Sequence, residues 1–232
     1  VRGVICKDGS EIHARRVAVA TGGVSYPQTG STGDGYRFAK QAGHTVVPAV
    51  PSLVPIVTRE DYCREMMGLS LRNVTLTVRR AGKKKPVFSE LGEMLFTHFG
   101  VSGPLVLSAS SHMTGDLGEY SMEIDLKTGL TVQQLYARLL RDFEKFINKD
   151  FSNALDELLP RKLIPVAVRL SGIAPDTKVN QITREEREKL ISVIKAFPVT
   201  PVRFRPVEEA IVTSGGVKVS EVDPHTMESR LV

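Results

Sequence analysis

The stretch that decides the fold is Ala18-Val19-Ala20-Thr21-Gly22-Gly23, followed by Thr32-Gly33-Asp34-Gly35. The first piece predicts a short apolar strand over 16–20 that stops at a glycine turn. The second predicts a tight turn that starts a helix running to Ala42, with Gly43 just beyond its end. Glycine removes the Cβ that would block a ligand, and a helix N-terminus offers free N–H groups. The pattern therefore fits either a backbone cradle for a cofactor or a plain strand–helix loop with turn glycines.

The composition of the chain narrows the class of protein. Its 232 residues are 41% hydrophobic and 25% charged, which is ordinary for a globular protein, and the formal charge is +5. The dense basic cluster Lys83-Lys84-Lys85 is interpreted as a solvated hairpin tip, and no aromatic residue interleaves with it, so we expect no nucleic-acid partner. No apolar run approaches about 18 residues, so we expect no membrane partner. Cys6 and Cys63 are isolated, which favours a reduced, cytoplasmic setting and no metal site.

The periodicity changes along the chain. Asp8-Gly9 predicts a hairpin between residues 2–6 and 11–14. Short strands are expected in a barrel or sandwich, together with one helix capped by Ser102, and a helical lobe follows. The expected strands are 53–58, 74–79, 87–88, 94–97 and 120–126. The expected helices of the lobe start at Thr131, 154, 160 and Thr183, the first and last with capping boxes to Gln134 and Glu186. Residues 199–206 should return to the barrel, with Val202 and Phe204 facing inward.

The segment 20–36, ATGGVSYPQTGSTGDGY, is more specific than its glycines alone. A strand ending in A-T-G-G and a T-G-D-G helix start resemble the FAD-binding domain of two-dinucleotide-fold flavoproteins, on the branch shared with fumarate reductases and succinate dehydrogenases. Together with residues 97–104 (THFGVSGP), 172–175 (GIAP) and 212–217 (VTSGGV), the chain resembles the HI0933-like, YhiN/BaiN-type family, also called aminoacetone-oxidase-family flavoproteins. The resemblance covers essentially the whole chain.

The resemblance implies a mixed α+β and α/β multidomain fold: part of a dinucleotide-binding domain with a β-barrel plus helical insert. The expected divisions are 1–50 for the partial FAD-binding domain, 51–127 for the barrel-like insert, 128–198 for its helical lobe, 199–210 for the return strand and 211–232 for the return to the FAD-binding domain. Family members begin with G-x-G-x-x-G and end in a glycine-rich segment that closes over the flavin. Since the 232 residues contain neither, we expect an internal fragment that by itself binds FAD weakly and is inactive.

The function implied is FAD-dependent oxidoreduction, with hydride passing between flavin and a small organic substrate, such as the double bond of an enone. NAD(P)H is one candidate electron donor. Two alternatives stay open: a non-catalytic binding or interaction module, and an amine-oxidising flavoenzyme. A tRNA-modifying flavoprotein is a weaker idea, because RNA binding requires a broad basic face.

Few catalytic groups are expected, because flavin supplies the redox chemistry. His98 is the catalytic candidate, as a proton donor beside a helix start, or else a hydrogen-bonded structural histidine. Tyr26, Ser102 and Gly103 are the candidate substrate contacts. The candidate cofactor contacts are Thr21, Gly22, Gly23, Ser25, Thr32, Gly33, Asp34 and Gly35. Asp34 would either cap its own helix or contact the ribityl hydroxyls, and the hypothesis requires the two glycine corners to lie together around open space.

Overall fold

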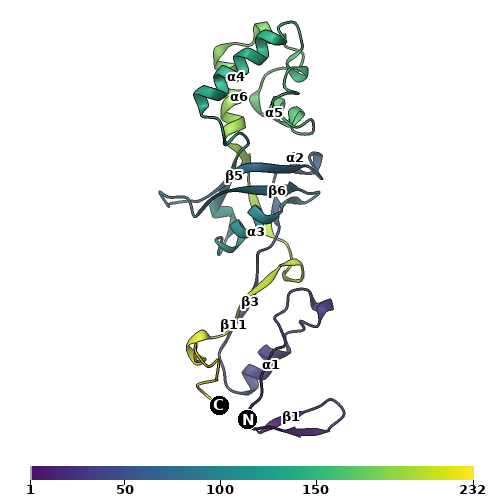
Figure 1. Cartoon of the computed structure of the whole chain (residues 1–232), viewed down its shortest axis with the longest axis vertical. Helices are drawn as coiled ribbons and strands as arrows, with labels where there is room; N and C mark the ends of the chain where they lie inside the picture. The colour runs from purple at the N-terminus through teal and green to yellow at the C-terminus, as the bar shows by residue number, and fades with distance from the viewer. Residues whose placement is uncertain (1) are drawn as a thin grey trace. The chain divides into compact units, whose positions relative to one another are not determined.

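A computed structural model describes residues 2–232, and the chain divides into two compact units (Figure 1). Unit 1 comprises the described residues up to Ser52 together with Pro206–Val232, and unit 2 is Leu53–Arg205. The chain therefore begins unit 1, completes unit 2 and returns to unit 1. Within residues 2–232, no helix has the length and apolar character needed to cross a bilayer.

Unit 2 is built on an antiparallel sheet of seven strands in the order β10-β4-β7-β6-β5-β8-β9. Its longest strands are β5 (Ser70–Arg80) and β6 (Phe88–Phe96), which form a hairpin whose turn carries the three lysines 83–85. The other strands are β4 (Ile56–Thr58), β7 (Gly100–Ser102), β8 (Tyr120–Asp125), β9 (Phe197–Val199) and β10 (Pro201–Phe204).

The two edge strands of this sheet are consecutive in the chain. β9 pairs with β8 at one edge and β10 pairs with β4 at the other, with only Thr200 between them. A single bent segment thus supplies both edges, and the sheet curls without forming a closed hydrogen-bonded ring. The fold is therefore mixed α+β with a curled, barrel-like sheet, which matches the coarser part of the sequence prediction.

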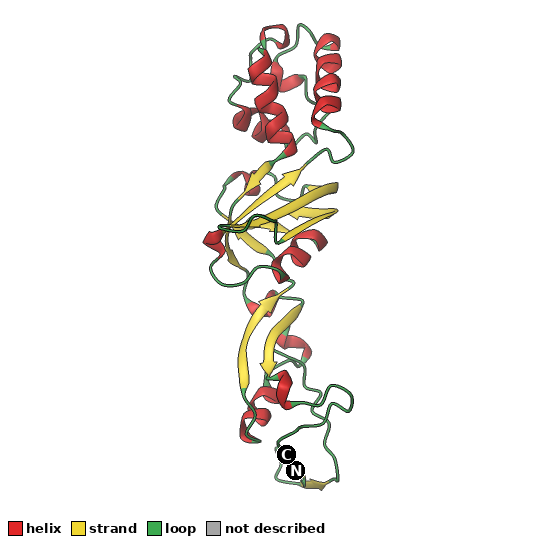
Figure 2. Ribbon diagram, turned by 90° about the vertical axis from the view of Figure 1, so that its left-hand side faces the viewer, coloured by secondary structure: helices red, strands yellow, loops and turns green. Residues whose placement is uncertain are grey.

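Helices cover this sheet on different sides (Figures 1 and 2). α3 (Pro104–Ser111) packs on β6 and β7, while α4 (Val132–Lys145), α5 (Ile164–Ser171) and α6 (Arg184–Lys195) group together, with α6 touching β8 and β9. The short α2 (Tyr62–Glu65) contacts β7. Both predicted capping boxes are confirmed, since Thr131 and Thr183 exchange hydrogen bonds with Gln134 and Glu186.

The large buried apolar cluster of the described residues belongs to unit 2. Its largest fully buried side chains include Phe96, Phe151 and Phe197, which come from the sheet and the helical lobe alike. α3 buries Leu105, Val106 and Ala109, and Met113 just beyond its end is also nearly inaccessible. Sheet and lobe therefore share one continuous core.

Unit 1 consists of smaller pieces. The hairpin of β1 (Gly3–Ile5) and β2 (Glu11–His13) confirms the Asp8-Gly9 turn prediction. α1 (Asp34–Gln41) contacts a ribbon formed by β3 (Val46–Ser52) and β11 (Val212–Val217). At the end of α1, the N–H of Gly43 donates to Lys40 and that of His44 donates to Ala39, which is the Schellman arrangement expected from the glycine. The described residues of both units also form six 3₁₀ turns, which are Pro27–Thr29, Leu117–Glu119, Phe151–Asn153, Val179–Gln181, Val207–Glu209 and Val219–Glu221.

Several sequence predictions are wrong in detail. Residues 16–20 form no strand and Val19 is 59% exposed, because no neighbouring strand pairs with this segment within the described chain. Residues 154–159 form turns and bends, since six residues before Pro160 are too few to establish a helix. Val202 is 47% exposed, because the register shift between Pro201 and Arg203 breaks the alternation with Phe204.

The capping prediction for Ser102 is also wrong, and the structure rules out the capping alternative for Asp34. Ser102 ends β7, and the residue that caps α3 is Gly103 at φ 94°, with Pro104 in the first turn, where its missing N–H costs nothing. Asp34 does not cap α1, because Gly33 takes that position in the left-handed conformation. The Asp34 carboxylate instead accepts hydrogen bonds from Thr32 Oγ1 at 3.1 Å and Arg37 Nη2 at 2.9 Å. Hydrogen bonding to Arg37 and then to Thr32 lowers the pKa of Asp34.

Candidate functional site

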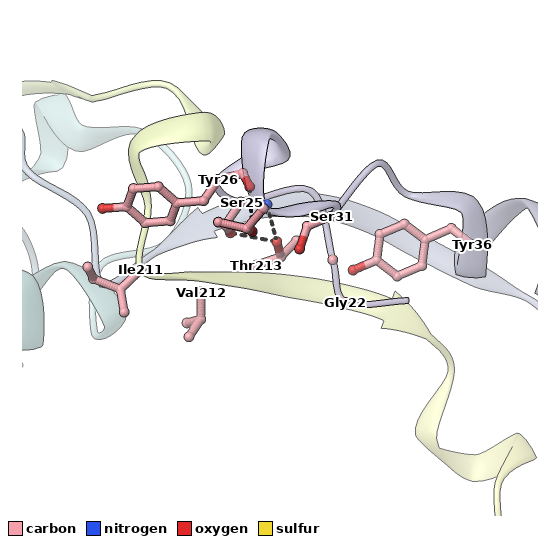
Figure 3. A pocket seen from close by; sticks show the side chains of 10 residues that line it. Gly22, Ser25, Tyr26, Ser31, Tyr36, Ile211, Val212 and Thr213 are labelled. Atoms are coloured by element: carbon pink, nitrogen blue, oxygen red, sulfur yellow. Dashed lines mark hydrogen bonds between the residues drawn. The ribbon is translucent and has the colours of Figure 1, made fainter. Parts of the chain in front are cut away.

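A pocket of about 420 Å³ lies within unit 1, where the glycine turn after residue 20 meets β11 (Figure 3). Figure 3 places Tyr26 and Tyr36 at opposite ends of this pocket, with Ser25, Thr213, Ser31 and Gly22 between them. Its lining residues are Gly22, Gly23, Ser25, Tyr26, Thr29, Ser31, Tyr36, Ile211, Val212 and Thr213.

Thr213 joins the two distant stretches of chain that make the pocket. Its Oγ1 accepts hydrogen bonds from the N–H groups of Val24 at 3.0 Å and Ser25 at 3.1 Å, and it lies 2.7 Å from Ser25 Oγ. The Ser25 side chain is buried, so these bonds replace water for polar groups that folding removes from solvent. The glycine turn therefore owes its position to a residue 188 or more positions later in the chain.

The two glycine corners do lie together, because the N–H of Gly33 donates to the carbonyl of Gly23 at 3.1 Å. Much of the space beside them is taken by other side chains of the protein. A Cβ on Gly23 would lie 2.5 Å from Thr213 Oγ1, and one on Gly35 would lie 2.4 Å from Thr21 Oγ1. These glycines thus allow close internal packing, and the open space lies on the side of Gly22 and Gly23 that faces the two tyrosines.

The pocket offers hydrogen-bond donors. Among residues 2–232, the backbone N–H groups of Gly22, Gly23 and Ser31 have no acceptor, and these three residues all line the pocket. The hydroxyls of Tyr26 and Tyr36 add polar groups at its ends. Free N–H groups beside a bare glycine surface suit a flat ligand with acceptor atoms on its edge.

Tyr26 has an unusual backbone. Its φ of 46° and ψ of 61° are left-handed, a conformation that is rare for a bulky non-glycine residue. The conformation is held by its N–H, which donates to Glu208, and by its carbonyl, which accepts from the N–H and hydroxyl of Thr29. Strain of this kind persists only where the surroundings impose it, and it is frequent beside ligand sites.

The structure brings together only part of the predicted site. Gly22, Gly23, Ser25 and Tyr26 line the pocket, and Thr21 lies behind it against Gly35. Thr32, Gly33, Asp34 and Gly35 form the start of α1 and are not among the lining residues. Lining residues that the site prediction missed are Ser31, Tyr36, Ile211, Val212 and Thr213. The resemblance of 212–217 to a family segment was the one feature of the sequence that pointed to β11.

The remaining candidates, His98, Ser102 and Gly103, belong to unit 2. His98 is exposed in the loop between β6 and β7, and its ring packs edge-on against Phe99 with 5.0 Å between centroids. Its ring nitrogens have no hydrogen-bond partner among the described residues. Gly103 fits closely against β6, since a Cβ there would lie 3.0 Å from the Cα of Met94.

The comparisons with known proteins bear on the whole chain. Residues 50–212 match the family model "HI0933-like protein barrel and H2TH domain". A ribosomal RNA dihydrouridine synthase of Haemophilus influenzae is 33% identical over 100% of this chain and 55% of its own length. The Escherichia coli protein of the same name is 31% identical over 97% and 54%, and a 3-dehydro-bile acid delta(4,6)-reductase of Clostridium scindens is 29% identical over 98% and 56%. The chain spans about half the length of these relatives.

These names overturn two expectations from the sequence. Two of the relatives are named for an activity on ribosomal RNA, so the prediction of a small organic substrate is wrong, and so is the prediction of no nucleic-acid partner. The names give no support to a non-catalytic module or an amine-oxidising enzyme. The lysine run is only part of the positive charge, because the whole formal charge of +5 belongs to unit 2. The match over residues 50–212 makes the chain a member of the HI0933-like family.

Proposed function

We propose that this chain is part of a flavin-dependent enzyme that reduces uridine to dihydrouridine in ribosomal RNA. The observation that carries the proposal is the pair of relatives named for this activity, which align with 97% and 100% of the chain at 31% and 33% identity. Alignment of that extent includes the pocket of unit 1 as well as the sheet and helices of unit 2.

The chemistry required is the addition of two hydrogens to one double bond. Dihydrouridine differs from uridine by hydrogen at C5 and C6 of the base, and the bond between these carbons is conjugated to the C4 carbonyl. A hydride therefore adds at C6 and a proton at C5, while the carbonyl accommodates the intermediate charge. A bound FAD, once reduced by an external two-electron donor, supplies the hydride. The protein has to hold the flavin and the base and to deliver the proton.

The pocket of unit 1 is the proposed flavin contact. The unpartnered N–H groups of Gly22, Gly23 and Ser31 match the acceptor atoms of a flavin nucleotide, and the glycines leave a bare surface against which a flat ring can lie. Ser25 supports this surface through Thr213. The start of α1 is fixed by residues that support the pocket without lining it, namely Thr21, Thr32, Gly33, Asp34 and Gly35. These roles, and those of Tyr26, Ser102 and Gly103 toward the substrate, are proposals.

His98 is the proposed proton donor. Its imidazole is exposed and its nitrogens are not engaged by the described residues, so either nitrogen is available to a substrate. Histidine is the side chain that most often serves as a general acid, which suits proton delivery to carbon. Replacement by glutamine keeps hydrogen bonding but removes the proton, so His98→Gln should lower the rate of reduction by about 10²-fold or more while RNA affinity is retained.

The charge distribution agrees with an RNA substrate. Unit 1 has as many acidic as basic residues, so the whole formal charge of +5 belongs to unit 2. Positive charge on one unit attracts the phosphate backbone of RNA and makes binding dependent on salt.

Two measurements in cells and in solution test the proposal. Ribosomal RNA from cells that lack the gene is digested to nucleosides and analysed by mass spectrometry, with and without a plasmid copy. We expect dihydrouridine to fall and to return with the wild-type gene but not with a Gly23→Val copy, whose side chain would collide with Thr213 and displace the glycine turn from β11. The purified full-length protein should carry a bleachable flavin absorbance. Unchanged dihydrouridine, together with a colourless protein that ignores added FAD, would refute the proposal.

A further inference from the structure

The turn that joins β5 to β6 carries a concentrated positive charge. Residues 79–87 contain Arg79, Arg80, Lys83, Lys84 and Lys85 and no aspartate or glutamate. Residues 81–86 are all exposed, and the turn extends outward from the sheet (Figures 1 and 2). The three lysines therefore stand where a large charged ligand can reach them. We name Lys83, Lys84 and Lys85 the lysine tip.

The backbone holds the lysine tip in a defined turn. The N–H of Lys83 donates to the carbonyl of Arg80 at 3.1 Å. Gly82, at φ +76°, supplies the left-handed residue that this tight turn requires. Pro86 restricts the residue before it, Lys85, to extended conformations. Since the turn is formed in advance, a ligand of the lysines has little backbone to order when it binds.

The arginines at the base of the turn are already paired, whereas the lysines are not. Arg80 donates to one carboxylate oxygen of Glu119 from Nε at 2.8 Å, and its Nη2 lies 2.7 Å from the same oxygen. Arg79 lies 3.6 Å from Glu123. The side chains of the lysine tip form no hydrogen bond or ion pair with residues 2–232. The unpaired positive charge of this hairpin therefore lies at its tip.

Two further carboxylates have to be weighed against this charge, those of Asp116 and Glu90. Asp116 keeps its negative charge, because within the described chain its carboxylate accepts only a backbone N–H. With Asp116 included, the five cations of residues 79–87 stand against three carboxylates, which leaves an excess of two positive charges. Glu90 pairs with Leu76, about 13 Å along the strand from Arg80, and so lies beyond the screening length of about 8 Å.

We propose that the lysine tip binds the phosphate backbone of a double-helical segment of ribosomal RNA. The inference rests on the proposed function and adds where the RNA is held. Ammonium groups bind phosphates as point charges, and a duplex carries more phosphates per unit length than a single strand. Residues 81–86 include no aromatic or arginine side chain on which an unpaired base can stack. The contact therefore depends on the phosphates and shape of a helix and not on exposed bases.

A contact of this kind contributes affinity and orientation without choosing a base sequence. The lysines are not among the residues that line the pocket of unit 1. Loss of the lysine tip should therefore raise the KM for RNA and leave the rate of reduction at saturating RNA unchanged.

The test measures the affinity of the full-length protein for an unmodified ribosomal RNA transcript by fluorescence anisotropy at several salt concentrations. The first variant combines Lys83→Gln, Lys84→Gln and Lys85→Gln. The second replaces the same three lysines by arginine, which keeps the charge. The matched control removes three exposed, ion-paired cations of the helical lobe by Lys145→Gln, Lys178→Gln and Arg184→Gln. Circular dichroism verifies that each variant is folded.

Both glutamine proteins lose three positive charges, so the difference between them reports the location of the contact. We expect the tip glutamine variant to lose about 10- to 100-fold in affinity, with the slope of log Kd against log salt reduced by roughly 2 to 3, because each duplex phosphate contributes about 0.9. The tip arginine variant and the lobe control should stay within about threefold of the wild type.

Wild-type affinity in the tip glutamine variant, or an equal loss in the lobe control, would overturn the inference. A loss seen on a single-stranded oligonucleotide but not on a perfect duplex would overturn the assignment to helical RNA. Dihydrouridine formation by the wild-type protein is measured on the same transcript. If it occurs while the tip glutamine variant binds normally, this inference alone has failed. If the transcript binds through the lysine tip but stays unmodified, the failure belongs to the proposed function.

Discussion

Among single residues, Thr213 has the clearest structural task. Its hydroxyl satisfies two backbone N–H groups and the Ser25 hydroxyl. Thr213→Val keeps the shape but leaves these groups without their acceptor, which costs about 1–3 kcal/mol for a buried group. We predict that amide hydrogen exchange at Val24 and Ser25 becomes at least about tenfold faster, as measured by mass spectrometry of peptides covering residues 20–26. Thr213→Ser keeps the acceptor and should exchange nearly as slowly as the wild type; equal exchange in all three proteins would contradict the assignment.

The two cysteines should react differently. Burial raises the pKa of the Cys63 thiol to about 11, while Cys6 is partly accessible in unit 1. Only the thiolate is nucleophilic, so iodoacetamide at pH 8 should modify Cys6 and leave Cys63 unmodified until the protein unfolds. Peptide mass spectrometry gives the two rates in one experiment. Modification of Cys63 in the native protein at a rate similar to that of Cys6 would show that α2 is not packed as described.

Among the elements, the ribbon of β3 and β11 depends on a close backbone contact. Gly215 lies at φ +97° where the register shifts, and a Cβ there would lie 2.3 Å from the carbonyl oxygen of Pro48. Because that atom belongs to the backbone, Gly215→Ala should open the ribbon and speed amide exchange in 46–52 and 212–217. Gly9→Ala is the matched control, since Gly9 has a similar φ of +85° but open space around it. If Gly9→Ala speeds exchange in its own hairpin of β1 and β2 as much as Gly215→Ala does in the ribbon, backbone strain alone, without the contact, decides the outcome.

The turn Val219–Glu221 is tied to the end of α1 by a contact that depends on pH. Hydrogen bonding from Thr45, through its side chain and backbone, lowers the pKa of Glu221, with a smaller contribution from His44. A carboxylate with a lowered pKa stabilises the folded state above its ordinary pKa near 4.5, and this stabilisation is lost as the pH falls through the lowered value. Pulsed hydrogen exchange should therefore show faster amide exchange in residues 218–232 below about pH 4.5. In Glu221→Gln that pH dependence should be absent.

The sequence predicted those elements that depend on neighbouring residues. The Asp8-Gly9 hairpin, both capping boxes and the Gly43 helix end rely on contacts within a few positions, and all are present. The predicted strand over 16–20 required a partner strand that one sequence cannot supply. The pocket was only half predictable for the same reason, because its glycine turn is visible locally, whereas Thr213 reaches it from 188 residues away.

At the scale of the whole chain, the two units differ in net charge, and we expect them to bind different ligands. Neutral unit 1 holds the pocket with unpartnered N–H groups, and unit 2 holds the continuous core and all of the excess positive charge. We therefore predict that salt weakens the binding of RNA much more than it weakens the binding of FAD. Titration of the full-length protein with each ligand at several salt concentrations checks this prediction, and similar slopes for the two ligands would contradict it.

The central claim is tested most directly with purified components. The full-length protein, its flavin reduced under anaerobic conditions, is mixed with an unmodified ribosomal RNA transcript, and the digested nucleosides are analysed by mass spectrometry. The account predicts that uridine in the transcript gains two hydrogens while the flavin returns to its oxidised spectrum. A transcript that stays unmodified although the protein holds reduced flavin and binds the RNA would contradict the account.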